Sequence, residues 1–299
     1  YEIRPRDWSS DVCSSDLVIG TAIGSGIFLV PSEMIRAVGT PSMVFLVWIF
    51  GGELSLFGAL TYGELSAALP GAGGECVYLD AAYGPLWGFI YGWTQTWVAK
   101  TASIATLATG FYRYASDFFP VLQQAIFIIP LPLGPGGKEL TVIYGQLLGI
   151  VLILFLSGVN YLGVRLGGSV QIAVTGLKIA LIVGIVAAGL WGGHASAASL
   201  QTSVTPMPGG VAGFFAALLA ALWAYDGWNN AGMVASEIEN PQRNLPRALI
   251  LGTTAMIGIY LLANLAYFAV LPAQAVAGSQ RVASDMMLQI AGPWGASAV

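Results

Sequence analysis

Long apolar stretches dominate this chain and restrict it to a membrane. Of its 299 residues, 56% are hydrophobic and only 9% are charged, which is too little polar surface for a water-soluble globule. A helix that crosses the hydrocarbon core of a bilayer needs about 20 predominantly apolar residues. Stretches of this length lie at residues 17–37, 41–69, 86–111, 142–162, 169–191, 210–236 and 246–271. We therefore predict an all-α transmembrane protein with seven spans and the start of an eighth near residue 283.

Small residues interrupt the first of these spans at residues 20–28, whose sequence is GTAIGSGIF. In hydrocarbon, irregular backbone is tolerated only where it lines a cavity or is buried in protein. A second interruption, WAYDGWNNAG at residues 223–232, falls in the sixth span. Two discontinuous helices in corresponding positions point to a binding site near the membrane midplane, and free N–H groups where a helix restarts favour an anionic group. Close helix packing through small residues is the alternative interpretation.

The organisation of the chain follows from these spans. We interpret residues 1–16 as a non-native leader, because this Ser/Asp-rich stretch meets the apolar run at residue 17 without a transition and fits no targeting signal. We expect residues 17–192 to hold helices 1–5, residues 193–209 to form a loop, and residues 210–299 to hold helices 6 and 7 with the start of helix 8. The chain ends inside that last segment, so we expect a fragment of a longer protein.

Three sequence motifs carry a resemblance to a known family. They are GTAIGSGIF at 20–28, GALTYGEL at 58–65 and ENPQRNLPR at 239–247. In combination they resemble the L-type amino acid transporter branch of the amino acid, polyamine and organocation superfamily. The resemblance implies an amino acid exchanger or permease with the leucine-transporter fold, an inverted five-plus-five helix repeat. Helices 1 to 7 and the start of helix 8 are expected in this chain, whose first repeat would be residues 17–192.

The resemblance also assigns a substrate site to the two interruptions. Four positions of the first break match those that hold the substrate carboxylate, namely Ala22, Gly24, Ser25 and Gly26. Backbone groups of the second break would receive the α-amino group, at Trp223, Ala224 and Asp226. Trp223 stands where the family usually has a Phe that closes over the substrate. We also expect Asn229, beside the second break, to touch the transport pathway, with an interhelical hydrogen bond as the alternative.

Two charged residues of the spans extend this prediction. The negative charge of Asp226 favours cationic substrates, with capping of the second half-helix as the alternative. Lys178 lies in the middle of the fifth span, where a lysine must be paired, neutral or hydrated. By the resemblance, Lys178 replaces a sodium ion beside the broken first helix, which makes transport sodium-independent. Proton exchange by Lys178, or a lysine that snorkels to the interface, are the alternatives.

Composition and motifs argue against other classes. The 11 Lys and Arg residues are scattered singly, which excludes the basic patch that nucleic acid needs. A single His194 and two cysteines favour neither a metal centre nor a disulfide framework, and we expect no cofactor. The sequence contains no hydrolase motif that would indicate a membrane-embedded enzyme. It also contains nothing that resembles the charged ring of a channel. We expect amino acid transport by alternating access, as exchange or proton-coupled uptake, with a cationic amino acid or polyamine permease as the alternative.

The expected partners are the amino acid substrate and the lipid bilayer. Eukaryotic members of the resembled family join a heavy subunit through a cysteine in the loop after helix 3, and residues 112–139 contain no cysteine. We therefore expect no disulfide-linked heavy subunit. A multi-pass protein of a bacterial inner membrane fits this pattern.

Overall fold

The computed structural model describes residues 18–69, 71, 73–131, 138–161, 164–238 and 240–297, so the predicted leader at 1–16 lies outside the described residues. The described chain is mostly helical. Five helical segments are long and apolar enough to cross a membrane, namely Pro41–Ala68, Tyr144–Tyr161, Gly168–Trp191, Gly210–Met233 and Pro241–Val270. They correspond to α3 (Pro41–Ala68), α7 (Tyr144–Tyr161), most of α8 (Val164–Trp191), α9 (Gly210–Tyr225) with the first part of η4 (Trp228–Glu237), and α10 (Pro241–Val270). The predicted helical transmembrane class is confirmed at this level.

The first and third predicted spans are helical without being single regular α-helices. The first consists of helical residues 18–22, an irregular stretch at 23–25, and α2 (Gly26–Val38). In the third, α5 (Pro85–Thr94), the π-helix η1 (Gln95–Lys100) and α6 (Thr101–Phe118) follow one another without a gap. The segment predicted as the start of an eighth span contains α12 (Val282–Ser297), which is kinked at Gly292 (φ 67°) and preceded by the short α11 (Ala273–Gly278).

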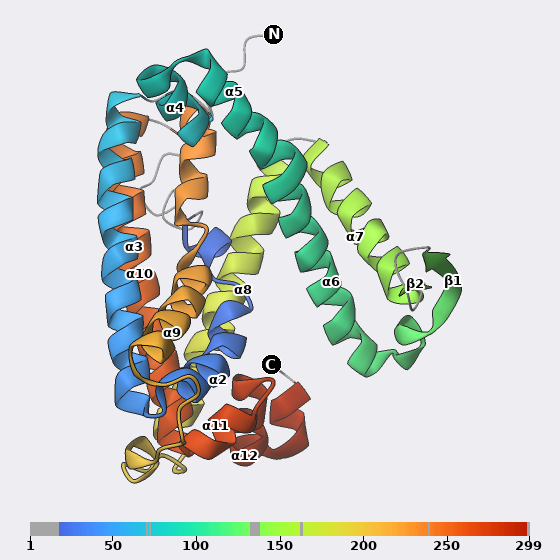
Figure 1. Cartoon of the computed structure of the whole chain (residues 1–299), viewed down its shortest axis with the longest axis vertical. Helices are drawn as coiled ribbons and strands as arrows, with labels where there is room; N and C mark the ends of the chain where they lie inside the picture. Colours follow the sequence, from blue (N-terminus) through green and yellow to red (C-terminus); the bar gives the residue numbers. More distant parts are fainter. Residues whose placement is uncertain are drawn as a thin grey trace. The chain divides into compact units, whose positions relative to one another are not determined.

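Contacts divide the chain into two compact units. One contains the described residues as far as Tyr78 together with those from Gln171 onward, and the other is Leu79–Val170. In the first unit α3 lies along α10 and α2 packs against α9 (Figure 1). In the second unit α6 packs against α7. This division reflects contacts, whereas the division into repeats at residues 17–192 and 210–299 is a statement about sequence and stays a prediction.

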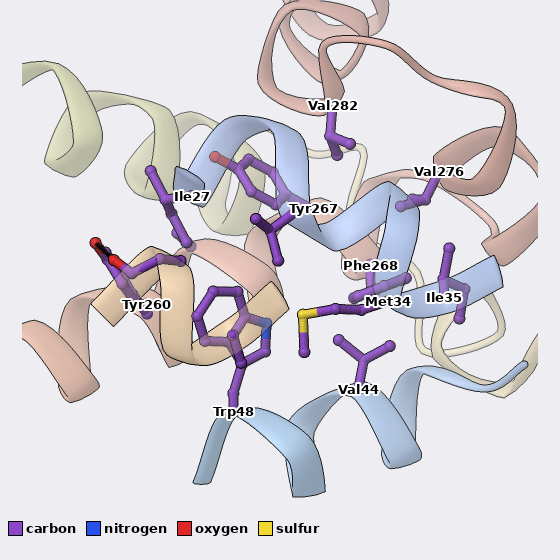
Figure 2. Close-up of a cluster of buried hydrophobic side chains, with 14 of the residues drawn as sticks. Ile27, Met34, Ile35, Val44, Trp48, Tyr260, Tyr267, Phe268, Val276 and Val282 are labelled. Carbon is purple, nitrogen blue, oxygen red and sulfur yellow. Dashed lines mark hydrogen bonds between the residues drawn. The ribbon is translucent and has the colours of Figure 1, made fainter. Parts of the chain in front are cut away.

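The core of the first unit forms where α2, α3 and α10 meet. Figure 2 shows its large side chains, among them Ile27 and Met34 from α2, Trp48 from α3, and Tyr267 from α10. The Trp48 ring packs edge-on against Tyr260, with ring centroids 5.2 Å apart. This ring contact joins α3 to α10.

Local sequence signals set the start of α3 and the end of α2. The Thr40 side chain accepts a hydrogen bond from the backbone N–H of Met43 at 3.4 Å, and Pro41 occupies the first helical position, where no N–H is needed. Gly39 closes α2 with φ 84°, a conformation that glycine adopts without strain.

A β-hairpin lies between the third and fourth predicted spans. β1 (Ala125–Leu131) pairs antiparallel with β2 (Lys138–Ile143), with Ile128 opposite Thr141. The hairpin corrects the prediction of an all-α chain, whereas most of the Pro/Gly-rich stretch at 130–137 lies outside the described residues. The flanking residues are mostly β-branched or aromatic and favour paired strands over irregular backbone.

Large apolar side chains remain exposed on several helices. Leu154 and Phe155 on α7 are 66% and 64% exposed, and Trp97 on η1 is 65% exposed. In a bilayer such side chains meet lipid tails, which are as apolar as leucine, so this surface is compatible with a membrane protein.

Candidate functional site

The first break leaves a group of backbone donors open. Ile23 still donates its N–H to the carbonyl of Ile19 at 2.9 Å, and regular bonding resumes with Phe28, which donates to Ser25 at 3.1 Å. Between them, within the described residues, the N–H groups of residues 24–27 donate to no backbone carbonyl. The predicted interruption is therefore confirmed. The open N–H groups lie at the start of α2, where the helix dipole favours a negative charge.

The second break separates α9 from η4. α9 ends at Tyr225, Asp226 is extended (φ −61°, ψ 146°), and Gly227 has φ 117°. The chain then continues as a 3-10 helix from Trp228. The predicted loss of regular helix at 223–232 is confirmed, and the cause is local: a positive φ at Gly227 cannot continue an α-helix.

The two breaks touch each other. The Thr21 hydroxyl lies 3.0 Å from the carbonyl oxygen of Gly227 and 3.1 Å from that of Val18, and it can donate its single proton to one of them at a time. A Cβ on Gly227 would lie 2.9 Å from the Thr21 carbonyl oxygen, and a Cβ on Gly26 would lie 2.9 Å from Cβ of Ala224. Glycine at both positions therefore permits the backbones of the first and sixth spans to meet.

Replacing Gly227 tests this contact. We expect Gly227→Ala to lower the melting temperature of the detergent-solubilised protein by several degrees, because alanine strains a positive φ by about 1–2 kcal/mol and its Cβ meets the Thr21 carbonyl. Gly184→Ala in α8, where a Cβ meets nothing within 4 Å, should leave the melting temperature unchanged or raise it slightly. Equal melting temperatures for the two variants would contradict a backbone contact at Gly227.

Lys178 covers the carbonyl end of the first half-helix. Its Nζ donates to the carbonyls of Gly20 at 3.2 Å and Ile23 at 3.1 Å, and the side chain is half-buried. These carbonyls form the negative end of the helix dipole, where a cation is stabilised. The contact between Lys178 and the broken helix, implied by the family resemblance, is present, and the alternative of a snorkelling lysine does not describe this side chain.

Tyr260 on α10 bridges the two breaks, and the sequence analysis missed it. The Tyr260 hydroxyl lies 2.9 Å from the carbonyl of Ala224 and 3.3 Å from that of Ala22, and the residue is fully buried. It can donate its single proton to one of these carbonyls at a time. The only local signal was a tyrosine within an apolar span, which by itself indicates nothing about a partner.

The remaining predicted residues differ in accessibility. Gly24 is exposed with open space beside it, Ser25 is partly exposed, and Ala22 and Ala224 are buried. The Trp223 side chain is 58% exposed and lies beside the start of α2, with its ring 3.6 Å from the position that a Cβ on Gly26 would occupy. The Trp223 carbonyl accepts the Asp226 N–H at 3.3 Å.

The Asp226 side chain is exposed and does not cap the second half-helix. Gly227 occupies the N-cap position of η4, which has no side-chain cap hydrogen bond. The capping alternative is therefore wrong. The carboxylate is available at the rim of the second break.

Asn229 is held by Glu75, the first residue of α4 (Glu75–Tyr83). The Asn229 side-chain Nδ2 donates to Oε1 of Glu75 at 2.6 Å. Glu75 is only 6% exposed, and its charge also affects its neighbours. Burial, and secondarily the Glu75 carboxylate, raise the pKa of the Cys76 thiol and of the Tyr78 hydroxyl.

Together these contacts divide the backbone groups at the breaks into two sets. Lys178 donates to the carbonyls of residues 20 and 23, and Tyr260 donates to the carbonyl of residue 22 or of residue 224, whereas the N–H groups of residues 24–27 donate to no backbone carbonyl. This arrangement suits a carboxylate better than a metal ion, and the described residues contain no group of three or more metal-binding side chains. A separate hollow on α5 is lined by Phe89, Ile90, Trp93 and Thr94 and offers no charged group to a ligand.

Apolar helices of membrane length, together with two broken helices in contact at the break, define a multi-pass membrane protein of the transporter class. Residues 15–299 match the family model described as amino acid permease, and the chain belongs to this family of transporters, which are not enzymes.

Individual relatives agree with the L-type resemblance. The chain is 34% identical to the serine/threonine exchanger SteT of Bacillus subtilis (strain 168) over 261 residues, which cover 87% of this chain and 54% of that protein. It is 32% identical to the b(0,+)-type amino acid transporter 1 of Mus musculus over 275 residues, covering 92% and 53%. The Asc-type amino acid transporter 1 of Mus musculus is 29% identical over 279 residues, covering 91% and 49%. The chain spans about half the length of the curated relatives it matches.

Proposed function

We propose that this chain belongs to a sodium-independent amino acid exchanger that works by alternating access. Its spans correspond to helices 1 to 7 and the start of helix 8 of a leucine-transporter-like inverted repeat. The substrate carboxylate binds the N–H groups at Gly24, Ser25 and Gly26, and the α-amino group binds at the second break. The protein acts in a bacterial cell membrane without a disulfide-linked heavy subunit.

The observation that carries this proposal is the contact of the two breaks together with the ammonium group of Lys178. Thr21 joins the first break to Gly227, and Lys178 supplies a fixed positive charge to the carbonyls of Gly20 and Ile23. A fixed cation at these carbonyls makes a bound metal cation unnecessary at the same position. Exchange is favoured over uptake coupled to an ion gradient because one relative is itself described as an exchanger.

Counterflow in proteoliposomes tests the proposal. The full-length protein is reconstituted, the vesicles are loaded with unlabelled L-serine, and uptake of labelled L-serine is measured in sodium and in choline medium. We expect uptake that requires internal amino acid and is equal in the two media. Uptake without internal amino acid that follows an inward proton gradient would replace exchange by proton-coupled transport, and uptake that ignores both would indicate a channel.

Asp226 favours a second candidate function, the transport of cationic amino acids. Its exposed carboxylate lies at the rim of the proposed site and can pair with a substrate cation. We expect Asp226→Asn to lower exchange of L-arginine at least about fivefold, equivalent to about 1 kcal/mol, while exchange of L-serine changes less than about twofold. Asp80→Asn, at an exposed position on α4, is the matched control. Equal effects on both substrates would remove the cationic assignment.

A further inference from the structure

Glu75 is a buried carboxylate with one bonded and one unbonded oxygen. Oε1 accepts the short hydrogen bond from Asn229, and Oε2 is enclosed without a hydrogen-bond partner among the described residues. Burying a carboxylate costs free energy unless other groups compensate its charge. Helix formation alone therefore does not explain a glutamate at position 75. As the first residue of α4, Glu75 is partly compensated by the positive end of that helix.

The backbone around Glu75 is seated directly on η4. The Gly73 N–H donates to the carbonyl of Met233 at 3.3 Å. A Cβ on Gly74, which has φ 53°, would lie 3.4 Å from the backbone carbon of Gly232. No side chain separates these two segments at their contact, so the Glu75 carboxylate is held at a fixed place beside Asn229.

The Glu75 carboxylate determines which way the Asn229 amide faces. A carboxylate only accepts hydrogen bonds, so the NH₂ group of Asn229 must point toward Glu75. The amide oxygen of Asn229 then points away from Glu75 as an acceptor, and this partly exposed side chain makes no second hydrogen bond among the described residues. The residue lies two positions after Gly227, where the two breaks meet.

We propose that Glu75 is a positioning residue of the transport site: it orients the Asn229 carboxamide so that the amide oxygen accepts a hydrogen bond from the α-ammonium group of the amino acid. This inference rests on the proposed function and adds to it a residue outside both broken helices. Glu75 acts through Asn229 and does not itself touch the substrate.

The titratable neighbours identified on α4 supply no cation to Glu75. Burial raises the pKa of Cys76 and of Tyr78, and the nearby Glu75 carboxylate raises both further, so the thiol and the hydroxyl stay neutral at physiological pH. Tyr78 also lies against η4, with its hydroxyl oxygen 3.5 Å from the position of a Cβ on Gly232. Within the described part of this region, the Asn229 amide is therefore the side-chain group that compensates the carboxylate, in addition to the positive end of α4.

Substitutions of Glu75 and Asn229, first singly and then together, test the orientation of the Asn229 amide. In Glu75→Gln, the introduced amide can donate as well as accept, so Asn229 is free to turn over. We expect the KM for L-serine exchange to rise about tenfold, while the maximal rate stays within about twofold. Asn229→Asp places two carboxylates in hydrogen-bond distance and should raise the KM at least as much.

The double variant that combines Glu75→Gln with Asn229→Asp reverses donor and acceptor. The introduced glutamine amide donates to one oxygen of the introduced aspartate, and the other aspartate oxygen again accepts from the substrate. The KM should therefore return to within about threefold of the parent value.

Glu64→Gln, at an exposed position of α3, is the matched control and should leave the KM unchanged. All values come from full-length protein in proteoliposomes loaded with L-serine, normalised to the monodisperse protein recovered. An unchanged KM in Glu75→Gln, or a double variant no better than the product of the single effects, overturns the positioning role alone. A parent protein that exchanges no amino acid overturns the proposed function and this inference with it.

Discussion

A Lys178→Met variant of the full-length protein is expected to exchange L-serine at less than about one tenth of the parent rate. The substitution keeps much of the side-chain length but removes the ammonium group that binds the carbonyls of Gly20 and Ile23. Hydrogen bonds from charged donors contribute about 1.5–3 kcal/mol each, and both carbonyls lie at the negative end of a half-helix. The initial rate of labelled uptake into loaded proteoliposomes measures the effect.

Sodium provides a second measurement on the same variant. If Lys178 replaces a bound sodium ion, the vacated carbonyls can bind one, so sodium medium should restore part of the Lys178→Met activity and leave the parent unaffected. Arg243→Met, at an exposed position of α10, is the control for loss of a cation and should retain the parent rate. Undiminished exchange by Lys178→Met with unchanged ion dependence would remove the proposed role.

Tyr260→Phe is expected to lower the exchange rate about tenfold and to lower the melting temperature. The hydroxyl of Tyr260 lies within hydrogen-bond distance of the carbonyls of Ala22 and Ala224 and donates to one of them at a time, so its removal leaves both breaks without this donor and one more buried acceptor unsatisfied. An unsatisfied buried polar group costs about 1–3 kcal/mol, which corresponds to about 5- to 150-fold in an equilibrium. Counterflow and thermal unfolding of the same preparation measure the two effects.

Tyr267→Phe is a closely matched control for this prediction. Tyr267 lies on the same helix and is also fully buried, but its hydroxyl has no hydrogen-bond partner among the described residues. Its removal should leave exchange within about twofold of the parent and should not destabilise the protein. If both variants behave alike, the bridge formed by Tyr260 between the breaks contributes nothing to transport.

The membrane class, the positions of the apolar helices, the two interruptions and the family could all be predicted from the order of residues alone. These features depend on information that is local along the chain. Apolar length decides which segments can cross a bilayer, and small residues with a glycine at positive φ end a helix wherever they occur. Lys178 could also be singled out, because a cation in an apolar span demands a partner even when the partner is unknown.

The side chains that complete the site became apparent only in the folded chain. Tyr260 is 238 residues from Ala22, and Asn229 is 154 residues from Glu75, yet each pair lies within hydrogen-bond distance. In the sequence alone, a tyrosine within an apolar span has many ordinary explanations, and so does a glutamate that follows such a span. The contact of α3 with α10 and the seating of Gly73 and Gly74 on η4 bring these residues to the breaks. Their roles depend on pairing across space, for which neighbouring residues in the sequence contain no signal.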